Sequence, residues 1–205
     1  MLLFIVRAFL RRTFDEVDLH WAADKIEHSP AGVSWIAGYS WALAELGRTG
    51  EAHDYLARIA PDRFAALPFD TNWLSALGEA SETVALLGDT TNAAVLYELL
   101  TPYTGRPMTA GRAVVSYGSA DRHLAELASM LGRADDATRH FEAALGLNAK
   151  TPAWLPHTRL AFARHLEACG EHERAAELAG EGARGAAAIG ITNTARWEQP
   201  IATRS

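Results

Sequence analysis

The stretch LGRADDATRHFEAAL, Leu131–Leu145, decides the fold of this chain. It begins with the Leu-Gly end of one helix, turns through a short polar segment, and continues as a second helix with Ala137, Phe141 and Ala144 on one face. Nearly the same phrase occurs three more times, as LGRTGEAHDYLARIA from Leu46, LGDTTNAAVLYELL from Leu87 and CGEHERAAELAGEG from Cys169. This recurrence predicts a series of helix–turn–helix units.

Aligned on their glycine, the four copies share residue types at fixed positions. A small residue precedes the glycine by seven positions, alanine follows it by five, and a mostly bulky residue follows that alanine by four. In chain order, these sets are Ser40, Ser81, Ala125 and Ala163; Gly47, Gly88, Gly132 and Gly170; Ala52, Ala93, Ala137 and Ala175; and Leu56, Tyr97, Phe141 and Ala179. We expect glycine to end the first helix in a left-handed residue. The small residues then let the two helices approach closely where they cross.

This pattern resembles the tetratricopeptide repeat, whose helix pairs stack into a solenoid. It predicts an all-α, tetratricopeptide-repeat-like α-solenoid of about five antiparallel helix pairs in a single domain, residues 1–188. The expected pairs span about 1–27, 30–60, 70–100, 119–146 and 152–188; the first is degenerate, with Arg12 and Val17 at the glycine and alanine positions. The copies depart from the usual period of about 34 residues, being 41, 44 and 38 residues apart, and the last contains Gly182 where a helix-favouring residue is expected.

Several expected helix starts agree with these pairs. Ser29-Pro30 and Thr151-Pro152 place a capping residue before a proline of the first turn, and Asp70 and Ser119 are expected to cap the helices that follow them.

Two segments do not follow the repeat. Residues 101–118 are expected to be a long loop, either a disordered insertion or an ordered segment against the repeats, and the apolar and aromatic residues Tyr103, Val114, Val115 and Tyr117 favour the ordered form. We therefore expect it to lie on the concave face and to form one wall of a pocket for an anionic or aromatic group. Residues 189–205 lack helical periodicity and are expected to be a frayed tail.

Composition limits the classes of function. With 19 basic and 25 acidic residues the net charge is −6, which argues against general binding to nucleic acid or to an anionic membrane. A single cysteine fits a reducing compartment, so we expect a cytoplasmic protein. The apolar start MLLFIVRAFLRR contains Arg7 and is followed by no cleavage site; it predicts a core helix, with a targeting or interfacial segment as the alternative.

A narrower resemblance rests on residues 30–190. The segments FDTNWL, LYELLTPY and YGSADRHLAELA, in that order, are similar to the C-terminal helical-repeat region of LuxR- and MalT-type signal-transduction ATPase regulators, especially of actinobacteria, and of ATPases fused to adenylate or guanylate cyclase domains. The resemblance implies a regulatory module that binds a protein partner or other domains of a larger regulator. No phosphate-binding Gly-x-x-x-x-Gly-Lys-Ser/Thr loop and no basic recognition helix are found in the sequence. An excised domain, a truncated relative and a free-standing protein all fit.

The sequence predicts no catalytic residues, no cofactor and no metal site. His165, Cys169 and His172 have spacings that zinc can use, but the repeat places Cys169 in the core as an inert thiol. The carboxylates Glu79 and Glu82 are expected on a solvated helix face. Ser116 and Ser119 lie near His123 without a nucleophile elbow. Enzymatic activity is therefore left uncertain and not favoured, and the oligomeric state is left open.

The candidate binding residues lie on the first helix of each pair, which lines the concave face of such a solenoid, and on the segment 101–118. Aromatic and arginine side chains form good anchors for a partner or ligand. They are Trp73, Tyr103, Arg106, Arg112, Tyr117, Arg122, His123, Trp154, His157 and Arg159. The alternatives to a protein-binding surface are a free-standing small-molecule-binding protein and a recruited enzyme of specialised metabolism. For any single residue, packing in the core is the competing explanation.

Overall fold

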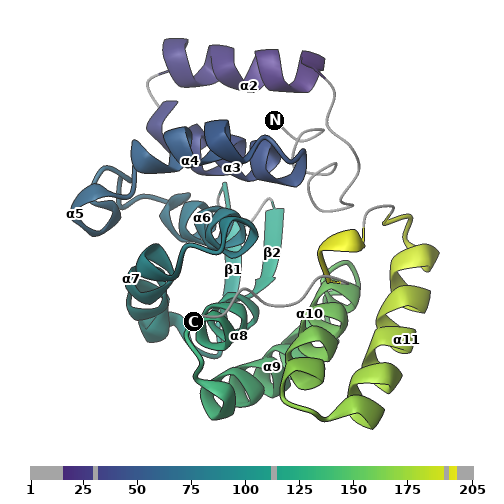
Figure 1. Ribbon diagram of the computed structural model, residues 1–205. Coiled ribbons are helices and arrows are strands. Elements are labelled where there is room, and N and C mark those ends of the chain that lie inside the picture. Colours follow the sequence, from purple (N-terminus) through teal and green to yellow (C-terminus); the bar gives the residue numbers. More distant parts are fainter. Residues whose placement is uncertain (1–15, 30–31, 112–114, 192–193, 198–205) are drawn as a thin grey trace.

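The computed structural model describes residues 16–29, 32–111, 115–191 and 194–197, and this part of the chain is mostly helical (Figure 1). The helices of the predicted pairs are α2 (Glu16–His28), α3 (Gly32–Glu45), α4 (Thr49–Ala57), α6 (Trp73–Leu87), α7 (Thr90–Leu100), α8 (Ala120–Met130), α9 (Ala134–Asn148), α10 (Leu155–Ala168) and α11 (His172–Ala188). Shorter elements are α5 (Pro61–Phe64), η1 (Thr101–Tyr103), β1 (Pro107–Ala110), β2 (Val115–Ser119) and η2 (Ala195–Trp197).

The four repeat glycines end their helices as predicted. Each has a left-handed backbone, with φ of 74°, 68°, 72° and 82° along the chain. In each turn the residue after the glycine donates its N–H to the carbonyl five residues earlier; Arg133, for example, bonds Ala128 at 2.9 Å. This bond satisfies a carbonyl that the last helical turn leaves without a partner. The local backbone therefore has one form in all four turns.

Close helix crossings follow from the small residues. Ser40, Ala125, Ala52 and Ala137 have no accessible surface, and the remaining residues of the two small sets are also buried. The first helices contact one another in the order α3, α6, α8 and α10, while the second helix of each pair packs on the first helix of the next pair. We call the side of α6, α8 and α10 on which β1 and β2 lie the inner face (Figure 1).

The segment 101–118 is a short 3-10 turn followed by strands, not the long loop that the sequence predicted. Strands β1 and β2 pair antiparallel, and the register shifts between Met108–Gly118 and Thr109–Ser116, which leaves Tyr117 as an extra residue on β2. Such a bulge turns the strand locally and redirects a side chain. The described part of the segment packs against α6 and α8, so it is no disordered insertion.

Side chains of the repeats bind the hairpin backbone. Asp121 accepts a hydrogen bond from the N–H of Gly105 at 2.7 Å, and Asn148 accepts one from Ser119 at 2.9 Å. Trp154 donates its indole N–H to the carbonyl of Ser116 at 2.8 Å. These bonds fix the hairpin on the inner face because buried backbone groups need partners.

Two of the expected helix caps need correction, and a third is confirmed. Helix α6 is capped at Asn72, whereas Asp70 accepts the N–H of Asn72 in the preceding turn. Helix α10 begins at Leu155 because residues 152–154 form turns, so Thr151 is not its cap. Ser119 does cap α8, by accepting the N–H of Asp121.

The C-terminal tail also differs from the prediction. It was expected to be frayed, but Ile191, Arg196 and Trp197 are buried. The expected first helix, with Arg12, and the proline after Ser29 lie outside the described residues.

Candidate functional site

A cluster of buried charges lies on the inner face. Arg122 of α8 has no accessible side-chain surface, and its guanidinium lies 2.7 Å from a carboxylate oxygen of Glu82 and 3.4 Å from one of Glu126. The two carboxylates are also almost fully buried, at 2% and 3% exposure. Since a buried charge is stable only with a counter-charge or hydrogen bonds, the three groups depend on one another.

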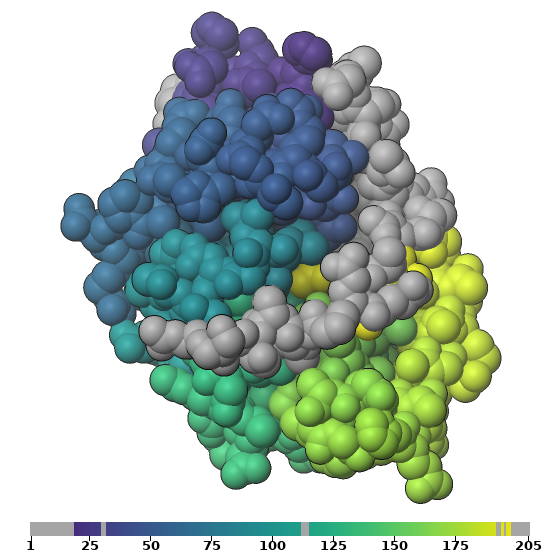
Figure 2. Space-filling model, in the orientation of Figure 1, coloured from purple at the N-terminus to yellow at the C-terminus, as the bar shows by residue number. Residues whose placement is uncertain are grey.

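A fourth charge enters this cluster from the C-terminal segment. Arg196 of η2 contacts Glu82, lies 3.1 Å from Glu126, and lies 3.6 Å from Glu45 of α3. In the space-filling view, atoms in the yellow of the C-terminal part are visible between the teal and the green helices (Figure 2). We call Glu45, Glu82, Arg122, Glu126 and Arg196 the charged centre.

The electrostatics of the charged centre favour a cation at Arg196. Burial lowers the pKa of the Arg196 guanidinium, but the carboxylates of Glu82 and Glu126 more than offset this, so its pKa is raised. Arg164 of α10 donates to the carbonyl of Arg196 at 3.1 Å, and burial lowers its own pKa. Arg196 thus adds a second guanidinium to the carboxylates of Glu82 and Glu126, which Arg122 also contacts. This place therefore suits a cationic group, whereas the sequence analysis expected an anionic or aromatic one.

Aromatic rings surround the arginines. Trp154 is buried, with the guanidinium of Arg122 5.1 Å from its ring centre and the ring of Tyr117 stacked at 6.3 Å. The ring of His157 lies between Trp154, at 4.9 Å, and Trp197, at 5.3 Å. Aromatic faces attract guanidinium groups, most strongly where water is excluded. The rings thus stabilise cations on this face in addition to the carboxylates.

A second acidic group lies beside the hairpin. Tyr117 donates its hydroxyl to the carboxylate of Glu79 at 2.5 Å. Burial raises the pKa of Glu79 from its ordinary 4.5 to about 7, and the bond from Tyr117 lowers it in part. Room for this carboxylate comes from Gly38, where an added Cβ would lie 3.1 Å from Glu79 Oε2. The bulge in β2 and the missing side chain at Gly38 together make this contact.

The structure brings together half of the residues that the sequence nominated. Those at or beside the charged centre are Tyr117, Arg122, His123, Trp154 and His157. His123 Nε2 lies 3.0 Å from the Arg122 guanidinium, which only donates, so this nitrogen is placed to accept.

The other nominated residues lie elsewhere. Trp73 and Tyr103 contact each other at 5.8 Å, with the exposed Phe69 against Trp73. Arg106 is exposed, and Arg159 pairs with Glu181 of α11 at 2.9 Å. Arg112 lies outside the described residues.

The acidic residues of the charged centre were missed, and the prediction of a solvated face is wrong for both Glu79, which is half-buried against Tyr117, and Glu82, which is buried. Helix α6 packs between α3 and α8, so the side of the helix that carries Glu82 is buried. A signal was present in the repeat alignment: the position six residues before each glycine holds Trp41, Glu82, Glu126 and Arg164. Each of these directly follows the small residue at the helix crossing. That position therefore points to the inner face in successive pairs.

Cys169 is exposed, so the prediction of a buried thiol is wrong. It lies at the end of α10, where the leucines of the other copies are half-buried, and its shorter side chain reaches less far back onto the helices. The pKa of the thiol is raised, mainly by partial burial and then by Glu171 and Asp135. His165 lies 3.6 Å from the sulfur, whereas His172 pairs with Glu167. Within the described ranges, no group of three His, Cys, Asp or Glu side chains is placed to hold a metal ion.

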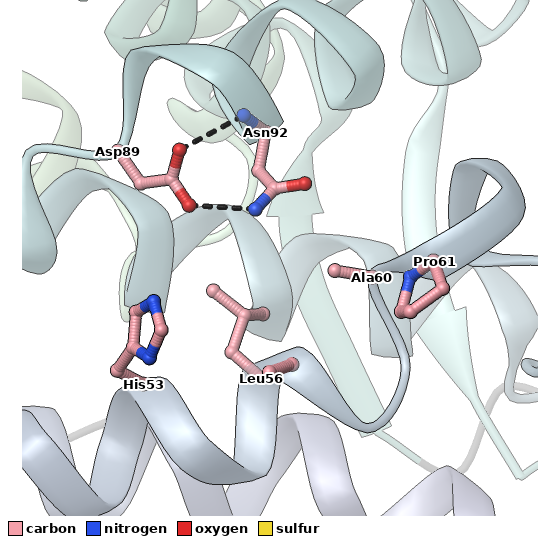
Figure 3. A pocket seen from close by; sticks show the side chains of 7 residues that line it. His53, Leu56, Ala60, Pro61, Asp89 and Asn92 are labelled. Carbon is pink, nitrogen blue, oxygen red and sulfur yellow. Dashed lines mark hydrogen bonds between the residues drawn. The ribbon is translucent and has the colours of Figure 1, made fainter.

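A hollow of about 290 Å³ lies between α4 and the start of α7 (Figure 3). It is lined by His53, Leu56, Ala57, Ala60, Pro61, Asp89 and Asn92. Its carboxylate, Asp89, accepts the backbone and side-chain N–H groups of Asn92 at 3.0 and 2.6 Å. Because this carboxylate already caps α7, the hollow offers weaker chemistry than the charged centre.

The chain matches no known family model, no curated protein and no solved structure. Among the described helices, none has the length and apolar character needed to cross a membrane.

Proposed function

We propose that this chain is a tetratricopeptide-repeat-like regulatory module whose inner face holds a segment of a partner protein or of another domain. The glycine turns and the buried small residues support the repeat type. The likeness to the repeat region of LuxR- and MalT-type regulators supports the regulatory role.

One observation carries the proposal: Arg196, from a segment outside the helix pairs, lies among carboxylates of three successive first helices, α3, α6 and α8. A face that positions carboxylates and aromatic rings in this way has the chemistry to recognise an extended basic and aromatic segment. A ligand that displaced Arg196 without bringing a guanidinium or ammonium group would remove a counter-charge from the buried carboxylates of Glu82 and Glu126. The carboxylates therefore favour a protein segment with a cation over the anionic ligand considered from the sequence.

Selection of peptides from a displayed random library on the full chain tests this function without assuming a sequence. We expect enriched peptides whose binding is lost in Glu82→Gln, since that change removes an inner-face charge. The matched control is Glu142→Gln on α9, which removes a carboxylate that is 55% exposed and pairs with Arg174. Binding that survives Glu82→Gln and is lost in Glu142→Gln, or no enrichment at all, contradicts the proposal.

A further inference from the structure

We propose that the C-terminal segment Thr194–Trp197 is an intramolecular ligand of the inner face, and that the partner displaces it with a segment in which arginine is directly followed by an aromatic residue. This inference rests on the proposed function and adds the chemistry and the regulation of the same site. It makes the described chain a self-occupied form of the module.

The contacts of Arg196 resemble those of a bound ligand. Its guanidinium meets carboxylates of three helices that are far apart in sequence, and its carbonyl accepts from Arg164 at 3.1 Å. Its Nε–H, which is buried, has no hydrogen-bond partner in the described part of the chain. One buried donor of the guanidinium is therefore unsatisfied, which weakens the binding of this segment to the inner face.

The residue after the arginine supplies a second anchor. Trp197 is 7% exposed and packs edge-to-face on His157 at 5.3 Å, and it belongs to the apolar cluster of Phe162 and Leu166. Large aromatic rings and arginines carry much of the binding energy at protein interfaces. The pair Arg-Trp thus contains both chemical features that the inner face recognises.

Because of the buried charges, we expect a cation of the partner to replace Arg196 directly and not to bind after Arg196 has left an empty site. If the segment left with nothing in its place, the buried carboxylates of Glu82 and Glu126 would lose the guanidinium of Arg196 that contacts both. Breaking a buried ion pair by removing one partner is strongly unfavourable. The segment is therefore expected to leave only when another cation binds to these carboxylates. Its release then depends on binding of a partner.

The short linker between α11 and the C-terminal segment determines how tightly a partner must bind to replace that segment. Only residues 189–193 separate the end of α11 from Thr194. A short linker gives its tethered segment an effective concentration in the range of about 1 mM. A partner in solution binds only those wild-type molecules whose C-terminal segment has left the inner face. Since this fraction is small, the apparent affinity of the partner is lower in proportion.

The test uses a synthetic peptide of residues 191–197, ITNTARW, and fluorescence anisotropy with the full chain. Arg196→Ala removes the guanidinium that contacts Glu82 and Glu126. We expect this variant to bind the peptide at least about tenfold more tightly than the wild type does. Arg139→Ala is the matched control, since it removes an arginine that is 68% exposed, and it is expected to behave as the wild type. A peptide with alanine in place of its arginine is expected not to bind Arg196→Ala.

A second measurement covers the case in which Arg196→Ala does not fold. The amide of Trp197 donates to the carbonyl of Thr194 at 3.0 Å, so its hydrogen exchange reports on the seated segment. In the wild-type chain, an excess of the peptide is expected to accelerate this exchange, and the arginine-to-alanine peptide is not. Unchanged exchange overturns the inference, and so do equal affinities for Arg196→Ala and wild type where the variant folds. Library peptides without an arginine–aromatic pair that still bind through Glu82 would overturn it as well, while leaving the proposed function intact.

Discussion

Two helical glycines are expected to respond differently to the same substitution, glycine to alanine. Gly182 lies in α11 and Gly146 in α9. In a helix interior alanine is favoured over glycine by about 1 kcal/mol. Gly146 lies in the last turn of α9 and an added Cβ there would meet nothing within 4 Å, so Gly146→Ala should raise the free energy of unfolding by up to about 1 kcal/mol.

At Gly182 the new methyl group collides with α10. Its Cβ would lie 2.8 Å from Cγ of Leu160, 3.0 Å from Cδ2 of the same side chain, and 3.2 Å from Cβ of Arg159. Cγ is a branch point near the backbone, so relief requires a shift of Leu160 in a well-packed place. Overpacking of this kind costs about 1–3 kcal/mol. Set against the helix preference, Gly182→Ala should be between neutral and about 2 kcal/mol less stable than the wild type.

Chemical denaturation of both variants, followed by circular dichroism, measures the difference. In a chain of this size, 1 kcal/mol corresponds to a shift in Tm of about 2–4 °C, so thermal scans resolve it too. The double variant Gly182→Ala, Leu160→Ala provides a check, since space made at Leu160 should remove part of the cost and give a measurable coupling energy. Equal stabilisation by alanine at Gly182 and Gly146 would refute the close approach of α10 and α11.

Ala137→Leu should lower the free energy of unfolding by about 1–3 kcal/mol because Ala137 has no accessible surface at a helix crossing, whereas Ala134→Leu at an exposed position should change it little; equal Tm values would contradict the alignment of the repeats. Cys169 should react with a maleimide in the native chain, faster as the pH rises, and labelling seen only after unfolding would show that the thiol is not exposed. Since the folded pKa of Glu79 is raised from 4.5 to about 7, the stability of the wild type relative to Glu79→Gln should be highest below pH 4.5 and fall by up to about 3 kcal/mol as the pH rises to 7; a flat difference across this range would refute the shift. In Tyr117→Phe the same fall should occur at higher pH, because the bond that lowers the pKa of Glu79 is gone.

The sequence by itself determined the helix pairs and the turns between them. A glycine in a left-handed conformation and an alanine at a crossing are local requirements, set by the backbone and by Cβ contacts, so their spacing carries the information. Gly132 and Ala137 illustrate this, the first with φ of 72° and the second fully buried. Five of the ten nominated residues also lie at or beside the charged centre, although Tyr117 belongs to β2 and not to a first helix, and Trp73 and Arg159 on first helices lie elsewhere.

Only the tertiary structure decided which charges are buried and what they meet. Glu82 looks like a solvated residue because a single helix offers no indication of which carboxylates its neighbours will cover, and its partners Arg122 and Arg196 lie 40 and 114 residues further along the chain. The bulge that aims Tyr117 at Glu79 depends on the pairing of β1 with β2. Cys169 is exposed because the repeat alignment predicts which way a side chain points but not how far it extends, and cysteine is shorter than the leucine of the other copies. The geometry of a turn depends on residues that are close in sequence. Burial of a charged side chain depends on how helix pairs that are distant in sequence pack against one another.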